Sequence, residues 1–285
     1  MKLLDGNKIS DEILRSLSTE VNQLKVNHVQ PKLAVLLVGK DPASLSYVKR
    51  KQKACAKTGV DWVQFDYETD VTTETLIDKI EELNEDEMIH GILVQLPLPE
   101  QIFEPDVIRA IDPKKDVDGF TAYNLGKMFL STEFEDLAPC TPLGVIRMLE
   151  HEKIEIEGKE AVVVGHSNIV GKPLGTMLLN RNATVTTCHI HTKDLASHTK
   201  RADILCVGVG KINLITEDMV KDGAVVVDIG INRNDEGKLV GDVDFENVSK
   251  KASYITPVPG GAGPMTVACL MENTVKAAKR LNNLK

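Results

Sequence analysis

Long apolar runs are missing from this sequence of 285 residues. No stretch approaches the roughly 20 apolar residues that a membrane-spanning helix requires. The first residues, Met1 to Gly6, also lack the apolar core of a signal peptide. We therefore expect no membrane association and no export.

Cysteine is scarce and shows no pairing pattern. The five residues are widely spaced, and no two of them form a C-x-x-C motif. An odd number without such a motif argues against a disulfide framework and against the usual zinc spacings. We expect reduced, mostly buried thiols in a cytoplasmic protein, at Cys55, Cys140, Cys188, Cys206 and Cys269.

An excess of positive charge is also missing. The formal net charge of −8 argues against general nucleic-acid binding. An anionic ligand would need a local attraction, for which the basic stretch from Lys49 to Lys57 is one candidate. The composition, 42% hydrophobic and 27% charged, is that of a globular protein, and the length allows two ordinary domains.

What the sequence does contain is an alternation of strand-like and helix-like segments. It predicts an α/β fold in which helices cover parallel sheets. Further short helices are expected near Leu195 and from Thr216. The other predicted helices span residues 7–26, 42–58, 73–84, 105–111, 172–181 and 264–281, and the strands 32–38, 60–67, 91–96, 161–164, 184–188, 204–209, 224–229 and 254–256.

Two lobes are predicted. Proline and glycine mark residues 113–144 as the crossover between domains. The N-terminal domain would span 1–120, completed by the C-terminal helix 265–285, and the second domain would span 121–264. A cleft between the two lobes is the default ligand site.

The second lobe contains the pattern of a dinucleotide-binding unit. The strand at 161–164 runs directly into Gly165, and a helix follows from Lys172. This layout predicts free N–H groups and a positive dipole end where a pyrophosphate would lie. The fingerprint G-x-G-x-x-G is incomplete, because Ser167 occupies its second glycine position.

The end of the next strand bears on the choice of nucleotide. NAD-selective sites usually hold the ribose with an acidic residue there, but this strand ends in Cys188, His189, Ile190 and His191. The missing acid favours NADP, with NAD as the alternative. No arginine is evident for a 2′-phosphate, although His166 and His191 offer donors. His189 and His191 would share a strand face, but no third and fourth ligand have zinc spacing, so we expect no metal.

Several short motifs are uninformative when taken alone but, taken together, are specific for one protein family. The motifs are Tyr47-x-x-x-Lys51, Val94-Gln95-Leu96-Pro97, Asp116-Val117-Asp118-Gly119-Phe120, Pro139-Cys140-Thr141-Pro142, Gly165-x-Ser167-x-x-Val170-Gly171-x-Pro173 and Pro257-Val258-Pro259-Gly260-Gly261. This ordered set resembles the bifunctional methylenetetrahydrofolate dehydrogenase/methenyltetrahydrofolate cyclohydrolase family, the FolD type, over nearly the whole chain. Because the sequence stops at Lys285, we expect the ligase domain of some relatives to be missing.

The resemblance implies two reactions and a set of residue roles. Hydride leaves 5,10-methylenetetrahydrofolate for the nicotinamide, and water then opens the methenyl product to 10-formyltetrahydrofolate. Lys51 would manage protons, its pKa lowered by burial and by the cationic substrate, and Gln95 would orient it. Tyr47 would pack against the folate rings, and Asp118 would accept hydrogen bonds from the pterin.

The remaining implied contacts belong to the pockets, and the resemblance also implies a homodimer. Leu96, Pro97, Gly261, Pro264 and Thr266 would contact the folate. Gly165, His166, Ser167 and Ile231 would hold the dinucleotide.

Three positions depart from the family pattern, and two other functions compete with this interpretation. His166 and Ile190 replace residues, often arginine or serine, that bear on the 2′-phosphate, and Ala262 replaces a valine. One competing function is a dehydrogenase that has lost its cyclohydrolase step, against which the retention of Tyr47, Lys51 and Gln95 argues. The other is a nucleotide-sensing protein without catalysis.

Overall fold

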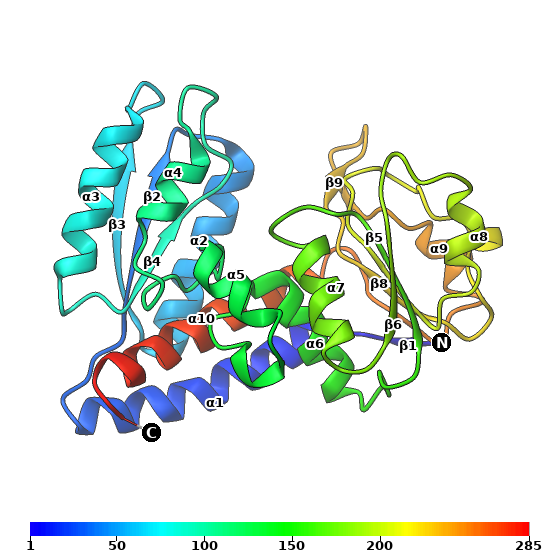
Figure 1. Ribbon diagram of the computed structural model, residues 1–285, viewed down its shortest axis with the longest axis horizontal. Coiled ribbons are helices and arrows are strands. Elements are labelled where there is room, and N and C mark those ends of the chain that lie inside the picture. Colours follow the sequence, from blue (N-terminus) through cyan, green and yellow to red (C-terminus); the bar gives the residue numbers. More distant parts are fainter. Residues whose placement is uncertain (285) are drawn as a thin grey trace. The chain divides into compact units, whose positions relative to one another are not determined.

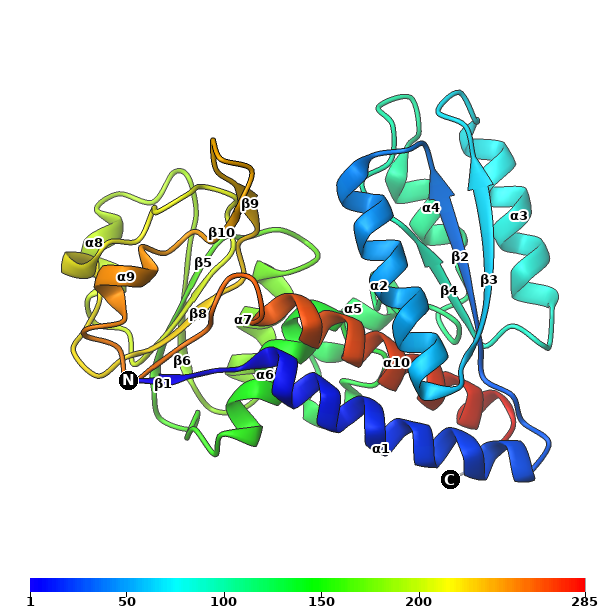
Figure 2. The same ribbon diagram turned by 180° about the vertical axis from the view of Figure 1, so that it is seen from behind.

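The computed structural model describes residues 1–284, which form two compact units (Figures 1 and 2). One unit, here called the six-stranded unit, comprises Met1–Ser10, Met128–Phe134 and Thr141–Thr266. The other, called the three-stranded unit, comprises Asp11–Lys127, Glu135–Cys140 and the chain from Val267. No helix among residues 1–284 combines the length and apolarity needed to cross a bilayer.

The three-stranded unit is built on a parallel sheet in the order β3-β2-β4. Its central strand β2 is buried along almost its whole length, as its unbroken apolar sequence predicts. Helices α3 and α4 pack their apolar faces on this sheet, as the buried cluster of Leu36, Leu76 and Val107 shows. The elements are β2 (Lys32–Val38), α2 (Pro42–Thr58), β3 (Asp61–Tyr67), α3 (Thr73–Glu85), β4 (Gly91–Val94) and α4 (Glu104–Ala110).

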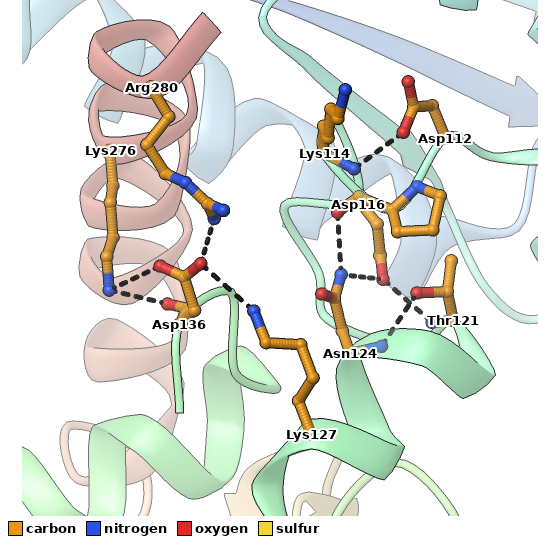
Figure 3. Close-up of polar contacts among 10 residues, drawn as sticks. Asp112, Lys114, Asp116, Thr121, Asn124, Lys127, Asp136, Lys276 and Arg280 are labelled. Carbon is orange, nitrogen blue, oxygen red and sulfur yellow. Dashed lines mark hydrogen bonds and ion pairs between the residues drawn. The ribbon is translucent and has the colours of Figure 1, made fainter. Parts of the chain in front are cut away.

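Two long helices complete this unit. From Asp11 onward α1 (Gly6–Val26) lies beside α10 (Ala262–Leu281) in both views, and Lys279 Nζ lies 2.9 Å from Glu20 Oε1. The segment 135–140 is fastened to α10 by Asp136, which pairs with Lys276 and Arg280 (Figure 3).

The six-stranded unit contains a fully parallel sheet in the order β1-β11-β8-β7-β5-β6. Apolar side chains of the inner strands, such as Val162, Leu205 and Val226, form its core. The strands are β1 (Lys2–Leu3), β5 (Glu160–Val164), β6 (Thr184–Cys188), β7 (Ile204–Val207), β8 (Val225–Asp228) and β11 (Tyr254–Ile255). The helices are α6 (Cys140–His151), α7 (Gly171–Leu179), α8 (Leu195–Thr199), η2 (Glu217–Met219) and α9 (Phe245–Val248), and a hairpin joins β9 (Asn232–Arg233) to β10 (Leu239–Val240).

The α/β fold agrees with the prediction, but some elements differ. The crossover expected at 113–144 contains α5 (Ala122–Met128), η1 (Thr132–Phe134) and the start of α6. The proline and glycine residues there predicted loops. A proline such as Pro142, however, is tolerated in the first turn of a helix. The predicted strand 91–96 ends at Val94, and 204–209 ends at Val207. Both runs continue as loops beyond the sheet.

The first ten residues differ from the predicted domain 1–120, because they belong to the six-stranded unit. Strand β1 pairs in parallel with β11, Lys2 opposite Tyr254 and Leu3 opposite Ile255. A two-residue strand has too little sequence to show a period, so no pattern at the N-terminus predicted it.

Candidate functional site

The six-stranded sheet has a point at which its strand order reverses. From β5 the chain passes to β6 on one side, then returns to β7 on the other side of β5. In open parallel sheets, ligands bind outside the carboxyl ends of the strands at such a point. The loops that follow β5 and β7 therefore form the candidate nucleotide site.

These two loops touch through glycine. Gly165 has a φ of 121°, in a region that disfavours other residues, and a Cβ there would collide with the carbonyl oxygen of Gly208. A Cβ at Gly171 would in turn collide with the carbonyl of Gly165. Gly165, the first glycine of the fingerprint, and Gly171, one position beyond its end, are thus required by close backbone approach.

Ser167, at the second glycine position, caps the helix that follows. Its Oγ accepts hydrogen bonds from the N–H groups of Val170 (3.2 Å) and Gly171 (3.4 Å), and its carbonyl accepts from Lys172 N (3.1 Å). The expectation of free N–H groups at the start of α7 was therefore wrong for these three. The serine hydroxyl satisfies two donors that glycine would leave open, and the Ser167 carbonyl satisfies the third.

Three histidine rings gather beyond the ends of β5 and β6. His166 and His189 have ring centroids 5.0 Å apart, and His189 and His191 have centroids 6.0 Å apart. The strand ends at Cys188, so His189 and His191 lie in the turn after it and not on a shared strand face. The N–H of His191 donates to His189 Nδ1 (3.2 Å), which leaves Nε2 of His189 as its outward donor.

The surroundings of these rings favour an anion. Residues 161–193 contain no aspartate or glutamate. Arg201 also lies near β6. Its Nη2 donates to Thr186 Oγ1 in the middle of that strand (2.9 Å), its Nε is 4.0 Å from Glu160 Oε2, and its charge opposes the rise that burial causes in the pKa of Cys188 at the strand end.

In the three-stranded unit, Lys51 and Gln95 form a buried pair. Lys51 on α2 is 6% exposed, and its Nζ donates to Gln95 Oε1 at 3.0 Å. Gln95 follows β4, and its Nε2 donates to the carbonyl of Leu96 at 2.7 Å. The amide of Gln95 is held at both ends, so it presents an acceptor to the lysine.

Asp118 lies close enough to this pair for the charge of Lys51 to act on it. Burial raises the pKa of Asp118 above its ordinary value, and the Asp116 charge adds to the rise. The charge of Lys51 and a hydrogen bond from the Cys140 thiol oppose it. Burial and the Asp118 charge in turn raise the pKa of Cys140 well above its usual range, so this thiol stays protonated.

Asp116 fixes the turn that carries Asp118. Its Oδ1 accepts from the N–H groups of Gly119 (2.9 Å) and Phe120 (3.1 Å), and its Oδ2 from Thr121 N (2.8 Å) and Asn124 Nδ2 (2.9 Å). Figure 3 shows Thr121 and Asn124 directed at this carboxylate. One carboxylate therefore holds the whole turn.

The other predicted site residues are distributed over both units. Tyr47, one turn before Lys51 on α2, is half-buried, and Arg50 lies 5.8 Å from its ring centroid. Leu96 is half-buried, and Pro97 and Ile231 are exposed. Gly261, Pro264 and Thr266 belong to the six-stranded unit, where Thr266 Oγ1 is 2.9 Å from Thr141 Oγ1.

No group of three or more histidine, cysteine or acidic side chains arranged to hold a metal ion occurs within residues 1–284. All five cysteines are buried and free of disulfide bonds.

Two family models match successive parts of the chain. Residues 4–118 match the catalytic domain of tetrahydrofolate dehydrogenase/cyclohydrolase, and residues 139–282 match its NAD(P)-binding domain. A bifunctional protein FolD of Nautilia profundicola is 58% identical over 279 residues, covering 98% of each chain. That of Campylobacter jejuni (strain RM1221) is 52% identical over 283 residues, covering 99% of this chain and 100% of the relative.

Solved structures agree. The crystal structure of the FolD enzyme from Campylobacter jejuni has a TM-score of 0.96 at 52% identity, covering 98% of this chain and 99% of that chain. The Trypanosoma brucei enzyme, crystallised with NADP and an inhibitor, has a TM-score of 0.93 at 37% identity, covering 97% and 96%. The chain belongs to the tetrahydrofolate dehydrogenase/cyclohydrolase family.

Proposed function

We propose that this protein oxidises 5,10-methylenetetrahydrofolate with NADP⁺ and hydrolyses the methenyl product to 10-formyltetrahydrofolate. The observation that carries the proposal is the buried hydrogen bond from Lys51 to Gln95 beside Asp118, within a chain of this family. The bound nicotinamide supplies a hydride acceptor. The folate nitrogens assist the departure of the hydride, so the chain needs only to align the two partners for this step.

The second step requires proton transfer. Water adds to the methenyl carbon and loses one proton. The remaining hydroxyl proton then leaves as the formyl carbonyl forms and the carbon–nitrogen bond to the ring opens, and that ring nitrogen keeps the released electron pair and takes up a proton. We assign the proton transfers to Lys51 Nζ, oriented by Gln95 Oε1 at 3.0 Å.

We also propose contacts with the folate for other residues of both units. We propose that Asp118 accepts hydrogen bonds from the pterin, that Tyr47 stacks on it, and that Leu96 and Pro97 pack beside it. By the resemblance of their loop, Gly261, Pro264 and Thr266 are proposed as further substrate contacts.

For the nucleotide, we propose Gly165, His166, Ser167 and Ile231. The exposed histidines and the lack of acids over residues 161–193 suit the 2′-phosphate of NADP.

The first test is a pair of progress curves with 5,10-methylenetetrahydrofolate, one with NADP⁺ and one with NAD⁺, following reduced nicotinamide and methenyltetrahydrofolate separately. We expect faster reduction with NADP⁺ and little accumulation of the methenyl form. Stoichiometric accumulation would show a dehydrogenase alone, and absence of reduction with either nucleotide would reject catalysis.

We further propose a cytoplasmic homodimer that acts in one-carbon metabolism and is linked through it to purine, methionine and histidine biosynthesis. The five reduced cysteines suit the cytoplasm. Strand β3 lies at the sheet edge with one side unpaired, and Nε1 of Trp62 on it has no partner within the described residues. Light scattering after size-exclusion chromatography would give the mass; a monomer would reject the dimer.

A further inference from the structure

Two buried carboxylates lie outside the catalytic set proposed above. Asp228, at the end of β8, is 3% exposed, and Asp242 is 0% exposed. An ionised carboxylate in such a place requires several hydrogen bonds, because burial removes its hydration. The partners of these two carboxylates show what they do.

Asp242 accepts hydrogen bonds from the backbone of the loop that follows β7. Its Oδ2 accepts from the N–H groups of Val209 (2.6 Å) and Gly210 (3.0 Å), and its Oδ1 accepts from Lys211 N (2.8 Å). A fourth bond, from Asn232 Nδ2 to Oδ1 (2.8 Å), comes from the residue after Ile231. One side chain thus holds three successive amides of one loop and a side chain of another.

Asp228 holds Asp242 in turn. Its Oδ1 accepts from Gly230 N (3.0 Å) and Asp242 N (3.0 Å), and its Oδ2 accepts from Val243 N (2.9 Å). Glycine makes the necessary room: a Cβ at Gly241 would collide with the Asp228 carboxylate, and a Cβ at Gly230 would collide with that of Asp242.

The location gives this pair a function. Val209–Lys211 continues from Gly208, whose carbonyl touches Gly165 at the point where the strand order reverses. Asn232 fixes the segment that presents Ile231. We propose that Asp242, held by Asp228, is a positioning residue that sets the two nucleotide-site loops after β7 and β8; this rests on the proposed nucleotide site.

Only a carboxylate suits this position. Four donors point at it, and both of its oxygens accept. An asparagine would keep one oxygen and turn an amide NH₂ toward N–H groups, leaving donors unsatisfied. The N–H groups of the loop would then lose their shared acceptor, while the hydrogen bonds between the strands of the sheet would remain.

The test compares Asp242→Asn with Asp244→Asn. Asp244 is a matched control, because it also lies in this segment but caps α9 by accepting from Asn247 N (3.4 Å) and Nδ2 (2.6 Å). Calorimetric titration measures the Kd for NADP⁺ and for tetrahydrofolate. We expect Asp242→Asn to raise the Kd for NADP⁺ by about tenfold or more and to leave that for tetrahydrofolate within a factor of about two; Asp244→Asn should change neither.

Hydrogen exchange of the ligand-free proteins gives a readout independent of turnover. The amides of Val209–Lys211 should be protected in the wild type and exchange faster in Asp242→Asn only. If Asp242→Asn does not fold, Asn232→Ala removes one donor and should still weaken NADP⁺ binding a few-fold.

The outcomes separate the two proposals. Unchanged NADP⁺ binding in a folded Asp242→Asn variant, or in Asn232→Ala if the first does not fold, would overturn the positioning role. An equal loss of both ligands would do the same, since it would show a merely structural part. A wild type that fails to bind NADP⁺ would reject the nucleotide site itself, and with it this role, even where the amide protection is as expected.

Discussion

Two aspartates in a single turn have different environments, although one residue separates them. Asp116 accepts four hydrogen bonds from its own turn and from Asn124, which uses its carboxylate fully. The carboxylate of Asp118 has a raised pKa because burial removes water without an equal number of donors. The Asp116 carboxylate is occupied by its own turn, and the Asp118 carboxylate is the one that we propose binds the pterin.

This contrast predicts opposite phenotypes. Asp116→Asn should lower the free energy of unfolding by about 1–3 kcal/mol, since an amide group would face N–H donors. Asp118→Asn should leave stability nearly unchanged and raise the KM for the folate. Urea titration and initial-rate kinetics on both variants measure this, and a large stability loss from Asp118→Asn alone would contradict it.

Lys51 offers a test of the division between the two reactions. Lys51→Met keeps the length and apolar stem of the side chain but removes the proton carrier. We expect the cyclohydrolase rate to fall by about 10²–10⁴-fold, the usual contribution of a positioned acid or base, with much less damage to folate binding. An unchanged hydrolysis rate would refute the assigned role of Lys51.

Asp228 should leave a signature in the pH dependence of stability. Burial raises its pKa from 3.8 to about 6. A carboxyl whose folded-state pKa is raised binds its proton more tightly when folded, so its contribution is full below the unfolded pKa and is lost as pH rises through 6. Relative to Asp228→Asn, the wild type should gain up to about 3 kcal/mol between about pH 7.5 and about pH 4. Urea titrations at these pH values test this; a difference that does not vary with pH would count against it.

At the scale of elements, the sequence predicted those that have clear end signals. Helix α2 was predicted with its observed bounds, because Asp41 caps its start and Gly59, at φ 81°, ends it. Helix α6 was missed, since Pro142 and Gly144 within it are typical of a loop. The buried contacts of Val145 and Leu149, which override that preference, are tertiary and leave no local signal.

The catalytic candidates show a similar division. Resemblance of motifs named Lys51, Gln95 and Asp118, and helical spacing placed Tyr47 and Lys51 on one face. The carboxylates that hold loops, Asp228 and Asp242, were not named. All but one of their partners are backbone N–H groups, the exception being Asn232 Nδ2. Since nearly every residue has a backbone N–H, the sequence does not show which of them converge on these carboxylates, and only the fold does.

Two glycine-to-alanine substitutions test how backbone conformation affects stability. Gly59→Ala should lower the free energy of unfolding by about 1 kcal/mol, because alanine is strained at positive φ. Gly126→Ala, inside α5 with nothing within 4 Å of the added Cβ, should instead raise it by about 0.5–1 kcal/mol. Thermal and urea unfolding measure both; equal signs would contradict this view of the two sites.

At the scale of the molecule, each unit is assembled from segments far apart in sequence. The three-stranded unit includes most of α10, from Val267 onward. The six-stranded unit takes in the N-terminal residues, because β1 adds to β11 and Leu4 N donates to the carbonyl of Ile255 (2.9 Å).

The N-terminal strand therefore bears on global stability. Leu4 is 0% exposed, whereas its neighbour Leu3 is 44% exposed. Leu4→Ala should lower the free energy of unfolding by about 2–4 kcal/mol through the lost burial and the cavity, and Leu3→Ala should change it by less than about 0.5 kcal/mol. Urea denaturation of the two variants measures these changes. A loss below about 0.5 kcal/mol in Leu4→Ala would show that the N-terminal strand contributes little to stability.

The pairing of β1 with β11 also has a consequence for biosynthesis. Residues 2–3 pair with residues 254–255, which the ribosome makes much later. The edge of the large sheet therefore cannot close until residues 254–255 have been translated, and β1 stays unpaired until then. Such long-range pairing slows folding, and an unpaired strand edge is open to association with other chains while it lasts.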